Sequence, residues 1–375
     1  RQMCIRDRLN KTISKVQTDK KAKQKTRQWW NSYWKRSYVF IDSGKIGSDY
    51  WKVGRNYQLF RYMLGCNAYG SEPTKFNGGL FTFDPVHIDS TRVFTPDFRL
   101  WGGGTMTAQN QRLVYFPMLK SGDFDMMKPQ FDFYERMLDN AKLRTKVYWN
   151  HGGACFSEQI ENFGLPNLAE YDWKPRHEGF PIGVDSNPWL EYTWDTALEF
   201  ALMMFDAHLY NNEPIVPHLP FIESLLTFFD EHYSYLALRR GTNKLDGDGH
   251  LVLYPGSACE TYKMATNATS TVAALKVITE KLLELPELDA TQREHWSGFL
   301  KRIPPISHRE VQGKKTISPA KMWERINNSE VPSLYPVYPW RIYGIGQPEL
   351  QTAINTYLYD PEAIEFRSHI GWKQD

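Results

Sequence analysis

The chain has 375 residues, 45 of them basic and 43 acidic, and its formal net charge is +2. This length suits two or three average domains or one large helical ring. Because the charges nearly balance along most of the chain, we expect no nucleic acid or other polyanion as a partner. No apolar run approaches the roughly 18 residues of a membrane span, so we expect none.

The N-terminus and the cysteine spacing indicate which residues fold and which scaffold types are excluded. Residues 1–8, RQMCIRDR, do not resemble native protein sequence, and we expect residues 9–375 to form the fold. The four cysteines lie far apart and form no CxxC pair. This spacing argues against both a zinc ribbon and a disulfide-rich scaffold.

Apolar periodicity along the chain is mostly helical. A single long helix is expected over residues 10–38 and another over 53–70, and residues 112–142 predict a helix, a Ser-Gly-Asp break and a further helix. Later helices are expected over 189–210, 219–237, 270–285, 292–303 and 348–359. The segment 189–210 has the clearest amphipathic pattern.

Long connectors rich in Gly and Pro separate these helices. Helical hairpins arranged in a ring would bring such connectors together at one rim, where they would line a pocket. The 13 Trp, 21 Tyr and 21 Phe exceed what a core usually needs. Aromatic faces pack on the apolar faces of sugars, so this excess favours a carbohydrate site, although any one ring can simply fill the core.

Glu260 stands out in the connector LVLYPGSACETYKMATNAT, where small residues precede it. A partly desolvated glutamate can hold a proton near neutral pH, as a general acid must. In the expected structure it follows a short strand, HLVLY, and precedes a helix. The alternative is therefore a carboxylate that only stabilises a helix N-terminus.

Two other connectors carry polar candidates. Asn110 and Arg112 follow a run of three glycines; an amide can hold a water or a sugar hydroxyl, but Asn110 could equally cap the next helix. His151 and Glu158 lie in HGGACFSEQ, where we expect hydroxyl recognition rather than metal binding, because the HExxH spacing is absent. No GxSxG elbow of a serine hydrolase occurs.

Several connectors together resemble one family. WWNSYWKRSYV and FRYMLGCNAYGSEPTKFNGGLF are similar to its aromatic first helix and to its Arg-Tyr helix with the following loop. AQNQRLVYFP resembles its N-I-N-x-Q-M-N-Y-W-P motif, PGSACE its P-S-x-S-P-E, and NSEVPSLYPVYP its H-x-H-x-x-H-L-Y-G-L-Y-P. With Gly371-Trp372 on a later G-W-S, the ordered series covers residues 28–372. The chain thus resembles the catalytic barrel of the six-hairpin glycosidases, specifically glycoside hydrolase family 95, the α-L-fucosidase and α-L-galactosidase group, and a related bacterial branch.

The resemblance implies an all-α fold, an (α/α)6 barrel or six-hairpin toroid, incomplete at its C-terminus and lacking the flanking β domains of the full-length protein. It makes Glu260 the general acid and Asn110 one of the residues that hold the attacking water. Glu330 and Ser333 stand where the family has histidines, and Ala108 where it has a first water-holding asparagine. The family's base, an aspartate, would lie beyond residue 375. Export to the periplasm or cell surface is expected.

We therefore expect an inverting, exo-acting glycoside hydrolase for a neutral oligo- or polysaccharide, with no metal or organic cofactor. Such a reaction needs two carboxyl groups about 6.5 to 9.5 Å apart. The candidate sugar contacts are Trp30, Trp34, Asn77, Trp101, Arg112, His151, Glu158 and Glu330. Two alternatives stay open: a non-catalytic carbohydrate-binding member of the fold, and a polysaccharide lyase on a similar toroid.

Overall fold

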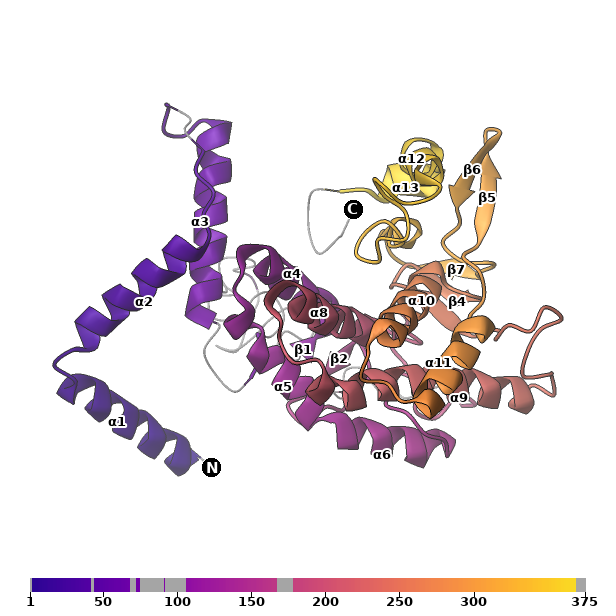
Figure 1. Cartoon of the computed structure of the whole chain (residues 1–375), viewed down its shortest axis with the longest axis horizontal. Coiled ribbons are helices and arrows are strands. Elements are labelled where there is room, and N and C mark those ends of the chain that lie inside the picture. The colour runs from indigo at the N-terminus through magenta and orange to yellow at the C-terminus, as the bar shows by residue number, and fades with distance from the viewer. Residues whose placement is uncertain are drawn as a thin grey trace.

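A computed structural model describes residues 2–41, 44–67, 72–74, 91, 106–166 and 178–368. Helices dominate these residues (Figure 1): α1 (Gln2–Thr18), α2 (Ala22–Arg36), α3 (Asp49–Asn67), α4 (Ala108–Ser121), α5 (Lys128–Arg136), α6 (Leu138–Trp149), α8 (Thr196–Asn211), α9 (Leu219–Arg239), α10 (Thr269–Glu284), α11 (Ala290–Arg302), α12 (Leu350–Tyr359) and α13 (Pro361–Phe366). The expected all-α class is confirmed for these residues.

The described strands are short and form three small antiparallel sheets. The strands are β1 (Met106–Thr107), β2 (Gln159–Ile160), β3 (Gly256–Ala258), β4 (Tyr262–Ala265), β5 (His308–Val311), β6 (Lys314–Ile317) and β7 (Arg325–Ile326). They pair as β1-β2, β3-β4-β7 and β5-β6. These sheets connect and flank the helices, and none of them closes a barrel within the described ranges.

Helix α8 lies at the centre of the helical packing and contacts α4, α9 and α10 (Figure 1). Every residue from Thr196 to Ala207 is buried. The expected amphipathic helix over 189–210 is therefore wrong in two respects: the helix begins at Thr196, and it is buried on all sides. A helix enclosed by three neighbours needs no polar face.

The expected long helix over residues 10–38 is interrupted. Asp19 causes the break, because its Oδ1 accepts a hydrogen bond from the backbone N–H of Lys21 at 2.9 Å and its Oδ2 pairs with Lys25 Nζ at 2.7 Å. A short acidic side chain that bonds its own backbone two residues on favours a turn over a continuing helix. The break after α4 was predicted correctly, and Gly122 ends that helix in the left-handed conformation, with φ +70°.

The hairpin β3-β4 determines where Glu260 lies. Glu260 occupies the turn between the two strands, and the next helix, α10, begins only at Thr269. The interpretation of Glu260 as a helix N-terminal carboxylate is therefore excluded. The expected strand HLVLY contributes only an isolated bridge between Leu251 and Leu245.

Candidate active site

Four glutamates and two cations from distant parts of the sequence meet around the β3-β4 turn. We call them the charge cluster: Glu158, Glu199, Glu260, Glu330, Arg112 and Lys263. They come from α4, the connector before β2, α8, the β3-β4 hairpin and the segment after β7. All are buried except Glu260, which is partly exposed. Three of the expected connectors thus meet residues of helices α4 and α8.

Arg112 holds the cluster together. Its Nη1 donates to Glu199 Oε1 at 2.9 Å, and its Nη2 donates to Glu330 Oε1 at 3.0 Å and to the hydroxyl of Tyr335 at 2.7 Å. The Tyr335 hydroxyl in turn donates to Glu330 Oε1 at 3.0 Å. Despite the cost of burial, these partners hold the pKa of Arg112 well above its usual value. The predicted sugar contacts Arg112 and Glu330 are therefore bound to one another.

Glu158 is fully buried and holds a proton more firmly than an ordinary glutamate. Its Oε1 accepts the backbone N–H of Gln109 at 2.6 Å. Burial, followed by the negative charge of Glu260, raises the pKa of Glu158 to about 8. Positive charge on Arg112 and the Gln109 N–H oppose that rise. Glu158 is thus mostly neutral at pH 7, as a desolvated carboxyl is expected to be.

Glu260 is the carboxyl of the cluster that solvent can reach. Its Oε2 accepts a hydrogen bond from Asn328 Nδ2 at 2.6 Å, and its backbone N–H donates to Glu330 Oε2 at 3.3 Å. Burial, followed by the charge of Glu330, raises the pKa of Glu260 to about 7, against the opposing effects of Lys263 and Asn328. A carboxyl with this pKa is present in both protonation states near neutral pH, which suits proton transfer.

Lys263, which the sequence did not single out, is a buried cation beside this carboxyl. Its Nζ donates to Ser257 Oγ at 2.9 Å and to Thr193 Oγ1 at 3.0 Å. Burial lowers the pKa of Lys263 to about 8, although Glu260 and the other nearby acids favour its charged form. Lys263 lies in β4 opposite Ser257 of β3, and only the hairpin register reveals this pairing.

A small cavity lies on the Glu158 side of the cluster. Its volume is about 10 Å³, and its lining includes Glu158, Thr196 and Trp340. Three atoms of these residues, Oε2, Oγ1 and Nε1 respectively, are buried without a hydrogen-bond partner among the described residues. Such a volume is near the minimum for one water. The cavity is therefore large enough for about one O–H group, and its three unpartnered polar atoms could form hydrogen bonds with that group.

Asn110 lies in the first turn of α4 and does not itself line this cavity. Its neighbour Gln109 lines the cavity and binds Glu158, while Ala108 donates its N–H to the Glu158 carbonyl at 2.9 Å. Asn110 is partly exposed. The N-cap position of α4 is Thr107, so the interpretation of Asn110 as the cap is excluded.

Trp30 and Trp34 do not meet the charge cluster. Their rings stack on each other at 6.5 Å, and Trp30 stacks on Tyr62 of α3 at 5.1 Å. A Cβ added to Gly65 would lie 2.9 Å from the Trp30 ring, so α2 and α3 pack tightly here. Figure 1 shows α2 and α3 far from β4. These two rings fill an interface between helices.

His151 also lies apart from the charge cluster. Its Nε2 is 2.9 Å from His232 Nδ1, and its ring stacks on Trp149 at 6.1 Å. Burial lowers the pKa of His151. His151 contacts Gly152 and residues of α6 and α9, which lie apart from Glu260 and Glu158. The candidates Asn77 and Trp101, with Gly371-Trp372, lie outside the described residues.

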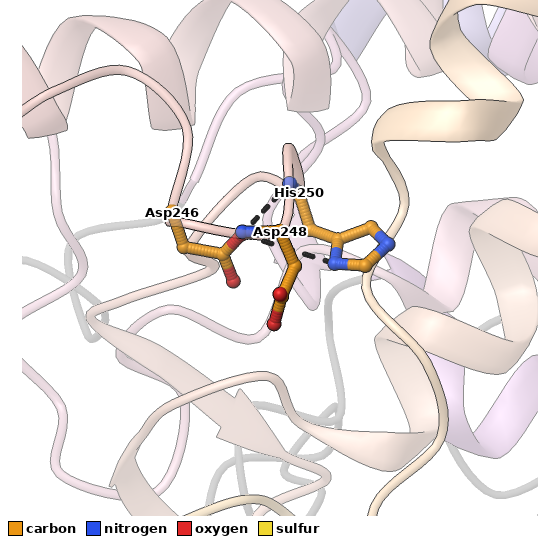
Figure 2. A group of neighbouring side chains, drawn as sticks. All are labelled: Asp246, Asp248 and His250. Carbon is orange, nitrogen blue, oxygen red and sulfur yellow. Dashed lines mark hydrogen bonds and ion pairs between the residues drawn. The ribbon is translucent and has the colours of Figure 1, made fainter.

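One group of side chains has the composition of a metal site. Asp246, Asp248 and His250 each offer a ligand atom, and these atoms lie within 4.8 Å of one another (Figure 2). Asp246 Oδ1 accepts the backbone N–H groups of Asp248 at 3.0 Å and His250 at 2.9 Å. The His250 N–H is also the main cause of the lowered pKa of Asp246. These bonds build a tight turn, which accounts for the grouping.

Two further expectations concern cysteines and membranes. Cys66, Cys155 and Cys259 are free thiols. Burial raises the pKa of Cys155 to about 12, so that thiol is unreactive. Within the described ranges, the helices are too short or too polar to cross a bilayer.

Comparison with known proteins finds similarity among solved structures alone. No family model matches the chain, and neither does any curated protein. Among solved structures it is similar to "Putative kojibiose phosphorylase from human microbiome", with a TM-score of 0.48, 15% sequence identity and 80% of this chain covered. The alignment spans 41% of that structure's chain. A likeness of this degree assigns neither a family nor a substrate.

Proposed function

We propose that the protein cleaves O-glycosidic bonds of a neutral oligo- or polysaccharide, with Glu260 as the general acid. The observation that carries this proposal is the state of Glu260: a partly exposed carboxyl at the rim of a buried charge cluster, with a pKa raised to about 7. The near-zero net charge suits an uncharged substrate better than a uronate polymer.

In this scheme the protonated Glu260 donates its proton to the leaving glycosidic oxygen as the C–O bond breaks. The departing sugar leaves as an alcohol, a water supplies the new hydroxyl of the product, and a second carboxylate, acting as general base, accepts the other proton of that water. Asn110 would help to orient that water, and the reaction would be inverting and exo-acting. Burial, followed by the nearby charge of Glu330, favours the protonated form of Glu260, so the proton is available to the leaving oxygen.

The remaining predicted contacts receive different roles. Arg112 and Glu330 satisfy each other, so we assign them to holding the site in shape rather than to binding sugar. Glu158 keeps one oxygen without a described partner beside the small cavity and stays a candidate for hydroxyl recognition. Trp30, Trp34 and His151 are not proposed as contacts in the same site, because their neighbours are other helices.

Leaving-group dependence tests the proposal. Aryl glycosides with poor leaving groups need protonation of the departing oxygen, whereas strongly activated ones such as dinitrophenyl glycosides do not. Glu260→Gln should lose roughly 10²- to 10⁴-fold in kcat on the former and little on the latter. A lyase would instead form an unsaturated product that absorbs in the ultraviolet. Saccharide binding without turnover by the wild type would indicate the non-catalytic alternative.

A further inference from the structure

The segment Asn327–Glu330 is hydrogen-bonded to the turn that carries Glu260. The backbone N–H of Asn327 donates to the Thr261 carbonyl at 2.8 Å, and the N–H of Glu330 donates to Thr261 Oγ1 at 2.9 Å. In the other direction, the N–H of Glu260 donates to Glu330 Oε2 at 3.3 Å. The turn and the segment are therefore bound through backbone groups on both sides, and their relative position is fixed.

Asn328 is the member of this segment that reaches the acid itself. Its Nδ2 donates to Glu260 Oε2 at 2.6 Å, while its Oδ1 accepts the backbone N–H of Ser329 at 2.9 Å. Since only the amide oxygen can accept that N–H, the orientation of the amide is determined, and its NH2 group must face Glu260. The position of one Glu260 oxygen is thus set by a side chain that is itself held.

This contact makes the two oxygens of Glu260 unequal. Oε2 is engaged by Asn328, and among the described residues no hydrogen bond to Oε1 is formed. In a protonated carboxyl the carbonyl oxygen is a stronger hydrogen-bond acceptor than the hydroxyl oxygen, so the amide bond to Oε2 favours the proton on the other oxygen. Oε1 is therefore the oxygen that would carry the proton.

We propose that Asn328 is the positioning residue for Glu260: it binds Oε2 and leaves Oε1 to donate the proton to the glycosidic oxygen. The inference rests on the proposed function of Glu260. It adds a residue that acts through the general acid without touching substrate. An amide donor also favours the ionised carboxylate, so Asn328 lowers the pKa of Glu260.

The test uses Asn328→Asp, which keeps the shape but removes the donor, and Asn328→Ala. Asn327→Ala is the matched control, since the Asn327 side chain binds the Pro188 carbonyl at 2.7 Å and not Glu260. Two readouts are needed: the pH profile of kcat on a poor leaving group, and a ¹³C NMR titration of the Glu260 carboxyl. The NMR titration does not depend on turnover.

In both Asn328 variants, the alkaline limb of the kcat pH profile and the titration of the Glu260 carboxyl should move to higher pH. Both variants should also lower kcat roughly tenfold, with KM unchanged. Activated leaving groups should be cleaved at the wild-type rate, and Asn327→Ala should change neither readout. An unmoved titration in both Asn328 variants, with Glu260→Gln inactive, would overturn the inference alone. Full activity of Glu260→Gln would overturn the proposed function and the inference with it.

Discussion

Glu158 and Glu260 interact electrostatically although they come from different connectors: burial, followed by the negative charge of Glu260, raises the pKa of Glu158. A carboxyl whose pKa rises on folding binds more protons in the folded state than in the unfolded one. Stability is then greatest below the unfolded pKa and falls as pH rises through the folded pKa. For Glu158 this window runs from the ordinary glutamate pKa of 4.5 to the folded-state pKa of about 8.

We therefore predict that Glu158→Gln flattens the decline of stability between pH 5 and pH 8. The wild type should lose on the order of a few kcal/mol over that range from this group, because one pKa unit corresponds to about 1.4 kcal/mol. Urea unfolding at several pH values measures the difference. An equally steep decline in the variant would mean that Glu158 is not the titrating group.

Arg112→Met should destabilise the fold strongly. The substitution leaves Glu199 and Glu330 buried without their cation, and breaking a buried pair in this way costs about 3–5 kcal/mol. Arg136→Met is the matched control, because its partner Glu72 is exposed and such pairs are worth about 0–1 kcal/mol. Thermal unfolding compares the two. Equal losses would contradict the central role of Arg112 in the cluster.

Gly153 should tolerate no side chain. Its φ is +80°, and an added Cβ would lie 2.2 Å from the backbone nitrogen of Phe228 in α9. Gly153→Ala should cost about 3 kcal/mol or more, through backbone strain and displacement of the connector that leads to Glu158. Gly249→Ala has a similar φ of +84° but nothing within 4 Å, so it should cost only about 1 kcal/mol. Denaturant unfolding separates these outcomes.

Lys263→Met should raise the pKa of Glu260. The positive charge of Lys263 favours the ionised form of that carboxyl, so its removal should move the alkaline limb of the pH–rate profile upward. Lys276→Met, which removes a half-exposed lysine paired with Glu280, serves as the control and should leave the limb in place. A downward shift in Lys263→Met would show that Lys263 acts on another group.

Sequence periodicity located most described helices because their apolar faces repeat over three or four turns. It failed at Asp19, where one local hydrogen bond ends a helix, and at α8, where burial on every side removes the polar face. It also predicted that Glu260 directly precedes a helix, because strands as short as β3 and β4 show almost no detectable alternation of apolar and polar residues.

Residue types in the connectors predicted part of the site. Glu158, Glu260, Glu330 and Arg112 do meet, although Arg112 comes from helix α4 and not from a connector. Trp30, Trp34 and His151 do not, because an excess of rings can equally be used in packing between helices. Lys263 and Asn328 could not have been chosen from sequence: their importance depends on hairpin register and on a single amide contact.

The central claim is that Glu260 supplies the proton that breaks a glycosidic bond. The most direct measurement is kcat against leaving-group acidity for a series of aryl glycosides, with wild type and Glu260→Gln compared at pH 6. We predict a weak dependence for the wild type and a steep one for the variant, with the two rates meeting at the most acidic leaving group. Parallel lines for the two proteins would contradict the claim.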